Sequence, residues 1–336
     1  MPQNQPPQRK QTRAEDSGSS GKASATQLLS YRRTIAQVNV ARAWEKDYSR
    51  SVTSTRSIRI AYSPDADDAF MFWAIAEGRI DTGELTFERS RADTEALNRA
   101  AEHTTAPHVS AVSIHQYAYL ADRYLLLPHG GSVGVGYGPV VVATRPLTDL
   151  RGLRIGVPGL RTSAYLVLRL LVPEFEPVVV PVAPFSRAFE AVKSGEVDAV
   201  LLIHEGRLLY EREGLSRVLE LGESWQALTG LPLPLGGNVI AKSLGAPLIE
   251  RISGLLRESI RYALEHRDEA LSTLLAQESR PGVPRDRAMF DRYLAMYANQ
   301  DTLDYGEQGR RAIQDLLDRG HAAGIIPHQV RAEFSP

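Results

Sequence analysis

The sequence predicts an α/β protein with two lobes, and three observations support this. Short apolar strands alternate with helical segments from residue 57 onward, the alternation starts afresh near residue 145, and the last part of the chain is helical. Alternation of this kind is typical of βαβ units around a mainly parallel sheet. We expect lobe 1 to comprise 57–144 plus 239–330 and lobe 2 to comprise 145–238. Two chain crossings would make a hinge, with a ligand cleft between the lobes.

Short strands and helices alternate in the first part of lobe 1. Residues 57–62 alternate between apolar and polar side chains as a strand does, and Gly78 is placed to cap the end of the first helix. Asp93 or Thr94 is a suitable N-cap for the next helix. The expected strands are 57–62, 85–88, 108–113, 124–127 and 139–143, and the expected helices are 70–76, 93–101 and one through Tyr117 and Leu120.

Lobe 2 contains the most apolar strand of the chain. Residues 197–203 are almost entirely apolar, which predicts a strand that is buried and central in its sheet. The expected strands of this lobe are 154–158, 178–182 and 197–203, and the expected helices are 162–171 and 184–193. After residue 241 the expected helices are 246–265, 268–278, 285–299 and 306–323.

Residues 1–56 form an N-terminal tail that we expect to be disordered or partly helical. Its first half is rich in Pro, Gln and Ser and holds almost nothing apolar to bury. A secretory signal needs an apolar stretch of about 7–15 residues, which this tail lacks. We interpret it as a surplus segment, with a transit peptide as the alternative, and expect the protein to be cytoplasmic.

The composition excludes several classes of protein. The chain has 336 residues, and its 39 basic and 40 acidic side chains leave a net charge of -1, so neither nucleic acid nor an anionic membrane is an expected partner. There is no Cys, which rules out disulfides, thiolate nucleophiles and Cys-ligated metal sites. No apolar run approaches the ~18 residues of a membrane span. The expected partner is a small-molecule substrate; the oligomeric state stays open.

His204 is the most informative residue for function. It follows the apolar strand 197–203 directly, and ligands of open α/β sheets bind beyond the carboxyl ends of the strands. An imidazole there can face the cleft and act as a general base near neutral pH. Glu205 could orient the loop or contact substrate. The structural alternative is a histidine that only caps the strand end. Among the other histidines, His115 is the one further cleft candidate.

An acidic loop joins the first strand to the first helix. Residues 63–70 read Ser-Pro-Asp-Ala-Asp-Asp-Ala-Phe, and the backbone N–H groups of this turn would favour an anion. The three carboxylates could instead hold a divalent metal. We favour a third interpretation for Asp67 and Asp68, in which they cap the helix and complement its dipole.

Three further segments are candidates for the pocket wall. The turn 158–164 offers the hydroxyls of Thr162 and Ser163, which suit a carboxylate or serve as N-caps. The Gly-rich segment 130–139 lacks the Gly-Lys-Ser/Thr ending of a phosphate-binding loop, and it precedes a strand and not a helix. We therefore expect its backbone to approach a flat ligand closely or to form a hinge. Residues 229–237 are stiff and are expected to form the second crossing.

These segments together resemble the 1,4-dihydroxy-6-naphthoate synthase family, the cyclic dehypoxanthine futalosine lyases of the futalosine route to menaquinone. The resemblance covers about 58–325. The pairing of Ile203-His204-Glu205 with Thr-Gly-Leu-Pro-Leu-Pro-Leu-Gly at 229–236 is its most specific part. The segments that carry it are 63–70, 109–113, 136–143, 158–164, 203–210 and 229–236.

The resemblance implies a two-lobe fold like the type II periplasmic binding proteins, and a lyase that acts on carbon–carbon or carbon–oxygen bonds without a metal or organic cofactor. It implies that His204 accepts a proton from cyclic dehypoxanthine futalosine. The residues expected to bind substrate are Ser63, Ala111, Val112, Ser113, Gly138, Thr162, Ser163, Ala164 and Glu205.

The sequence departs from the family in the acidic loop. Members often read Ser-Pro-Cys-Pro-Asn-Asp-Thr-Phe where this chain has residues 63–70, so the threonine hydroxyl is lost at Ala69. The alternatives to this function are the chorismate dehydratase of the same pathway, which shares the fold, and a solute-binding protein for a small organic acid.

Overall fold

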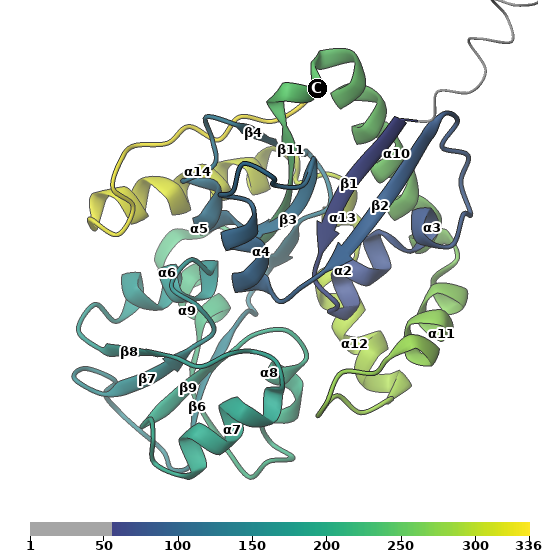
Figure 1. Ribbon diagram of the computed structural model, residues 1–336. Helices are drawn as coiled ribbons and strands as arrows, with labels where there is room; N and C mark the ends of the chain where they lie inside the picture. The colour runs from purple at the N-terminus through teal and green to yellow at the C-terminus, as the bar shows by residue number, and fades with distance from the viewer. Residues whose placement is uncertain (1–55) are drawn as a thin grey trace, which may run out of the picture. The chain divides into compact units, whose positions relative to one another are not determined.

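Two mixed β-sheets, each covered by helices, form the part of the protein that the structure describes (Figure 1). The structure is a computed structural model, and it describes residues 56–336. The predicted tail lies outside these residues, except for Arg56, which begins the first strand. The fold class predicted from the alternating pattern is confirmed.

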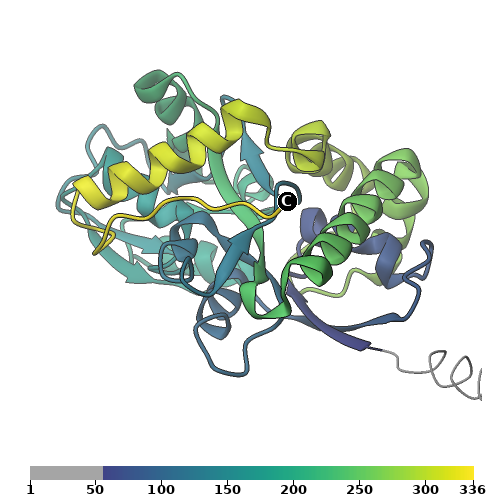
Figure 2. The same cartoon turned by 90° about the horizontal axis from the view of Figure 1, so that it is seen from above.

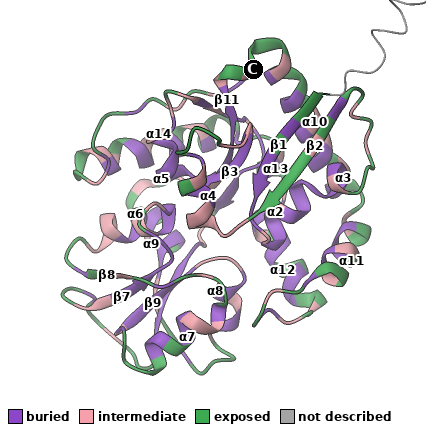
Figure 3. Cartoon of the chain, in the orientation of Figure 1, coloured by how far each residue is buried: buried purple, intermediate pink, exposed green. Residues whose placement is uncertain are grey.

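The first sheet has the strand order β2-β1-β3-β11-β4, and β5 also pairs with β11. β1 lies parallel to β2 and β3, whereas β11 runs antiparallel to β3, β4 and β5. β2 is the edge strand and is largely exposed (Figure 3). The strands are β1 (Arg56–Tyr62), β2 (Leu85–Arg91), β3 (Val109–Ser113), β4 (Tyr124–Leu126), β5 (Ser132–Gly134) and β11 (Leu233–Ala241).

The second sheet has the order β10-β6-β9-β7-β8. β7 is parallel to β8 and β9, and β6 is antiparallel to β9 and β10. β9 lies between β6 and β7 and is entirely buried, which agrees with the central strand predicted from its apolar sequence. The strands are β6 (Val140–Ala143), β7 (Arg154–Val157), β8 (Glu176–Val179), β9 (Ala199–Leu202) and β10 (Ser216–Glu220).

Two sequence-based expectations about the sheets were wrong. The sheets are mixed and not mainly parallel, because β11 and β6, next to the crossings, run against their neighbours. β6 pairs with β9 and β10, so residues 140–143 belong to the second sheet and not to the expected first segment 57–144. The apolar sequence of β6 predicted a buried strand but not its sheet. The remaining lobe division stays a proposal.

Helices surround both sheets. The expected helix 70–76 is two short helices that begin at Ala66, because Asp65 and not a later residue takes the N-cap position. The four expected C-terminal helices are each found within two residues of their predicted bounds. The helices are α2 (Ala66–Met71), α3 (Trp73–Ala76), α4 (Thr94–Ala100), α5 (Ile114–Tyr117), α6 (Ser163–Leu171), α7 (Phe185–Lys193), α8 (Gly206–Leu209), α9 (Leu221–Thr229), α10 (Ala246–Glu265), α11 (Arg267–Gln277), α12 (Arg287–Tyr297), α13 (Gln300–Leu303) and α14 (Gly306–Ala322), with a 3-10 turn at Lys242–Leu244.

The C-terminal segment returns to the first sheet. After α14 the chain runs back along that helix, as the view from above shows (Figure 2), and Phe334 forms a bridge with Leu126 of β4. One apolar core cluster includes residues of both sheets, among them Val112 and Ile155. Across residues 56–336, no helix combines the length and the apolarity that crossing a bilayer requires.

Candidate active site

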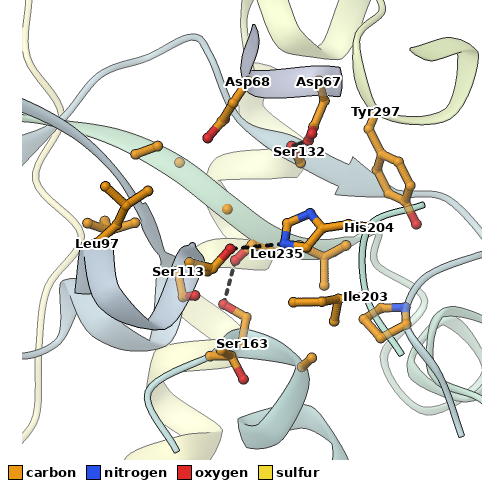
Figure 4. A pocket seen from close by; sticks show the side chains of 18 of the residues that line it. Asp67, Asp68, Leu97, Ser113, Ser132, Ser163, Ile203, His204, Leu235 and Tyr297 are labelled. Atoms are coloured by element: carbon orange, nitrogen blue, oxygen red, sulfur yellow. Dashed lines mark hydrogen bonds between the residues drawn. The ribbon is translucent and has the colours of Figure 1, made fainter. Parts of the chain in front are cut away.

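A cavity with a solvent-accessible volume of about 90 Å³, partly open to solvent, lies where elements of the two sheets meet. Its wall comes from the end of β3, the first turns of α2, α4 and α6, the residues after β9, the start of β11, and α12. Figure 4 shows Asp67, Ser113, Ser163 and His204 around this space. Its lining combines apolar side chains with a few polar groups, as small-molecule sites do. The cleft expected from the two-lobe pattern is therefore present as a cavity.

Seven of the predicted site residues line this cavity. They come from the end of β3, from the turn that begins α6, and from the end of β9: Ala111, Val112, Ser113, Thr162, Ser163, Ala164 and His204. Ser63, Gly138 and Glu205 do not line it. The Gly138 N–H donates to Glu220 and its carbonyl accepts from Arg207, so this residue is part of the backbone frame.

His204 lies two residues beyond the end of β9, with a positive φ of 51°. This left-handed conformation costs a non-glycine residue of the order of 1 kcal/mol and is found disproportionately at functional sites. Its Nε2 lies 2.9 Å from the hydroxyl of Thr94, and both residues line the cavity. Its Nδ1 lies 3.1 Å from Oδ2 of Asp65. The imidazole therefore has one nitrogen beside a hydroxyl of the cavity wall and the other beside a buried carboxylate.

The acidic loop before α2 is bound by protein groups. Asp65 occupies the N-cap position of α2 but makes no capping hydrogen bond; instead it accepts one from the Ser63 hydroxyl at 2.5 Å. Burial is the main cause that raises the pKa of Asp65 to about 6. Asp67 accepts from the hydroxyls of Ser132 (2.6 Å) and Tyr293 (3.2 Å).

Asp68 accepts from the backbone N–H of Ser63 at 2.8 Å. Burial, with the neighbouring Asp67 carboxylate adding to it, raises the pKa of Asp68 well above its usual value. Asp67 and Asp68 do lie in the first turn of α2, as expected, but neither caps the helix. Within 56–336 no group of three or more His, Asp or Glu side chains is arranged to hold a metal ion.

An ion cluster formed by Arg280 and three carboxylates lies behind the acidic loop. Arg280, between α11 and α12, donates to Asp65 (2.7 Å), Glu205 (2.6 Å) and Glu278 (2.5 Å). Glu205 is fully buried, and its Oε1 also accepts from the N–H of Ala66. Glu205 thus holds the loop from behind and does not face the cavity. An arginine whose side chain is 15% exposed and which contacts three carboxylates is held by strong, charge-assisted hydrogen bonds.

The turn at 159–164 begins α6 and contributes the opposite wall. Thr162 is the N-cap, and its hydroxyl accepts from the N–H of Tyr165 and donates to the carbonyl of Gly159. The Ser163 hydroxyl donates to the carbonyl of Leu235 at 2.5 Å. Both hydroxyls are therefore used within the protein. The first backbone N–H groups of α6 have no hydrogen-bond partner within the helix. They are the groups of this wall that can donate to a bound anion.

His115 is buried behind this turn and does not line the cavity. Its Nδ1 lies 3.3 Å from the carbonyl of Thr162, and burial lowers its pKa to about 4. It is therefore neutral near pH 7 and has no direct access to a ligand in the cavity. His204 is the histidine that the structure places on the wall.

The Gly-rich segment is shaped mainly by contacts with the protein itself. Gly130 lines the cavity, where close approach to a ligand was expected. A Cβ atom at Gly131 would collide with the Tyr305 ring, and one at Gly134 with the carbonyl of Tyr137. The glycines therefore allow β5 and its flanking turns to pack closely.

Comparison with known proteins places the chain in a family. Residues 58–322 match the profile of the menaquinone biosynthesis family. Two relatives, described as 1,4-dihydroxy-6-naphthoate synthases, are each 38% identical: that of Thermus thermophilus covers 83% of this chain and 99% of its own, and that of Streptomyces coelicolor 82% and 96%. The chain belongs to the menaquinone biosynthesis family. The family resemblance stated from the sequence motifs is confirmed.

Solved structures agree with the assignment to the menaquinone biosynthesis family. A crystal structure of a protein from Archaeoglobus fulgidus is 42% identical, covers 81% of this chain and all of its own, and superposes with a TM-score of 0.74. The alkanesulfonate-binding protein SsuA of Xanthomonas axonopodis is only 18% identical over 82% of this chain and 96% of its own, with a TM-score of 0.61. That second likeness shows the fold alone, which is the type II periplasmic-binding-protein fold.

Sequence reasoning missed several residues of the cavity wall and of the acidic loop's surroundings. Tyr293 and Tyr297 of α12 line the cavity, and Arg280 holds the acidic loop. All three lie more than 200 residues from the acidic loop, in a region whose helical pattern indicates packing and not chemistry. Arg207 lies one turn beyond His204 and could have been noticed by its proximity to the Ile-His-Glu motif.

Proposed function

We propose that the protein is a 1,4-dihydroxy-6-naphthoate synthase, a lyase that converts cyclic dehypoxanthine futalosine, with His204 as the general base. The observation that carries the proposal is the imidazole on the cavity wall, whose Nε2 lies beside the Thr94 hydroxyl of the same wall and whose Nδ1 lies beside a carboxylate. Membership of the menaquinone biosynthesis family, together with relatives described by that activity, supports the reaction class.

The proposed reaction depends mainly on one well-placed general base. The substrate must release its sugar-derived fragment while the remaining bicycle becomes aromatic, so proton removal is the central task. A positioned base contributes about 10²–10⁴-fold to the rate. The naphthoate carboxylate would be met by the start of α6, where Ser163 and Ala164 line the cavity. A second cavity adjoins at Thr94 and His204 and offers room for the leaving fragment.

A product assay tests this function directly. Purified protein incubated with cyclic dehypoxanthine futalosine is expected to form 1,4-dihydroxy-6-naphthoate with multiple turnovers. A parallel incubation with chorismate is expected to leave its pyruvyl ether intact. Turnover of chorismate instead would show a chorismate dehydratase, and binding of either compound without turnover would show a solute-binding protein.

Filling the cavity should weaken substrate binding without affecting the fold. Gly236 lines the cavity, and a Cβ atom there would find only the Val112 carbonyl within 4 Å. Gly236→Leu is therefore expected to raise KM by at least about tenfold, because its side chain occupies space that the substrate needs. Gly254→Leu is the matched control, since Gly254 is exposed on α10 and has open space around its Cβ position. An unchanged KM in Gly236→Leu would contradict the assignment of this cavity.

Removal of residues 1–50 is expected to leave kcat and KM within about twofold. All of the proposed site residues lie between 63 and 297, and the family match begins at residue 58. Steady-state kinetics of the truncated chain beside the full chain would measure the effect. A large loss of kcat would mean that the tail contributes to the reaction.

A further inference from the structure

Among residues 56–336, Asp65 is the one carboxylate within salt-bridge distance of His204. Its Oδ2 lies 3.1 Å from Nδ1 of the imidazole, and both side chains are largely buried. An ionised carboxylate only accepts hydrogen bonds, so a lone pair on Nδ1 at this distance would be repelled, and the contact favours a neutral imidazole with its proton on Nδ1. The lone pair is then on Nε2, the nitrogen 2.9 Å from the hydroxyl of Thr94, which lines the cavity. The contact therefore selects the tautomer that a base at this wall needs.

The orientation of the Asp65 carboxylate is fixed by its other partners. Arg280 donates to Oδ1 at 2.7 Å, and the Ser63 hydroxyl donates to Oδ2 at 2.5 Å. The hydroxyl of Tyr293 lies 3.5 Å from His204 Nδ1, but donates its hydrogen to Asp67. Its oxygen is therefore a second acceptor near Nδ1 and favours the same tautomer.

We propose that Asp65 is a positioning residue for His204, which holds the imidazole with its proton on Nδ1 and stabilises the imidazolium that forms when Nε2 accepts a proton. The proposal rests on the role of His204 in the proposed function. It gives a role to the Asp65 carboxylate, which occupies the position in the acidic loop where family members often have Cys. In the step itself, a substrate C–H or O–H bond breaks, its electrons stay on the substrate, and Nε2 gains the proton.

The amide variant Asp65→Asn tests the proposal, because Arg280 dictates how the amide must lie. Arginine only donates hydrogen bonds, so the amide oxygen takes the Arg280 side and the NH₂ group faces His204. That NH₂ donates to Nδ1, which moves the imidazole proton to Nε2 and removes the base. We expect kcat to fall by about 10²–10⁴-fold with KM within about threefold, as a wrong tautomer predicts.

A second measurement reads the tautomer without turnover. In protein labelled with ¹⁵N at histidine, the His204 resonances, assigned by their loss in His204→Asn, are expected to report Nδ1–H in the wild type and Nε2–H in Asp65→Asn. Failure of the product assay would overturn the proposed function, but the tautomer of His204 measured by NMR would still test the contact with Asp65. A wild-type imidazole protonated at Nε2, or a kcat in Asp65→Asn within about threefold of wild type, would overturn the role of Asp65.

A matched control separates positioning from general stability. Glu278→Gln removes a carboxylate from the same arginine, but Glu278 does not contact the imidazole. It is expected to keep kcat within about threefold and the wild-type tautomer. A loss of kcat in Glu278→Gln equal to that in Asp65→Asn would mean that the whole ion cluster acts, and would overturn a specific role for Asp65.

The pH profile gives a further readout. The charged or titratable groups that face Asp65 are His204, Glu205, Arg280, Asp67 and Asp68. Burial, to which Glu205 and Asp67 add, outweighs the lowering by His204 and Arg280 and raises the pKa of Asp65 to about 6. As pH falls below about 6 the carboxylate takes up a proton and loses the charge that favours a proton on Nδ1, so wild-type kcat is expected to fall there. A kcat that stays constant down to about pH 5 would contradict the proposal.

Discussion

His204→Asn is expected to lower kcat by about 10²–10⁴-fold while the protein remains folded. Asparagine is the best replacement at this position, because His204 has a φ of 51° and Asn tolerates the left-handed region better than other residues except glycine. Alanine would combine the loss of the base with added backbone strain. The amide of Asn has no basic nitrogen, so the proton acceptor is removed and little else changes. Steady-state kinetics with the futalosine-derived substrate would measure the loss.

The matched control for this substitution is His266→Asn. His266 is an exposed histidine between α10 and α11, and it does not line the cavity. It is expected to keep wild-type kcat and KM. Circular dichroism and thermal melting would confirm the fold of both variants. Near-wild-type turnover in a folded His204→Asn protein would show that another group takes the proton.

Arg280→Met is expected to cause the largest loss of stability, about 3–5 kcal/mol in the free energy of unfolding. The methionine fills much of the volume of the arginine but leaves Asp65, Glu205 and Glu278 without their shared cation. These carboxylates are buried, and an uncompensated buried charge costs far more than an exposed one. Urea denaturation of the variant beside the wild type would measure the difference.

The destabilisation should depend on pH in a known direction. Burial already raises the pKa of Asp65 to about 6 against the lowering by Arg280, so loss of the cation raises it further. The folded variant therefore binds more protons than the unfolded chain. Stability of the variant therefore rises as pH falls, and the deficit should be smaller near pH 5.5 than near pH 8. Arg251→Met is the control, because the Arg251–Glu84 pair is exposed and is expected to contribute at most about 1 kcal/mol. An equal, pH-independent loss in both variants would contradict the account of the buried cluster.

The sequence predicted those parts of the molecule that local pattern determines. The apolar run before His204 identified both the central strand and the residue at its end, since strand burial and strand termination are local properties. The N-cap at Thr162 could likewise be read from residue type alone.

What the sequence could not provide were contacts between distant segments. Asp65 was recognised as part of an acidic loop, yet its partners Arg280 and His204 lie 215 and 139 residues away. The metal and capping interpretations of this loop both assumed local partners. The placement of β6 was missed for a similar reason, because an apolar strand next to a crossing can pair with either sheet and only the complete fold selects one.

Asp65 and His204 follow strands of different sheets. Asp65 follows β1 of the first sheet, and His204 follows β9 of the second. Any opening movement that lets substrate in would pull them apart and would also break at least one of the Arg280 bonds to Asp65 and Glu205. Asp65 would then orient the His204 imidazole only in the closed form, which also excludes water. In an open enzyme without substrate, the imidazole would not be held as a base.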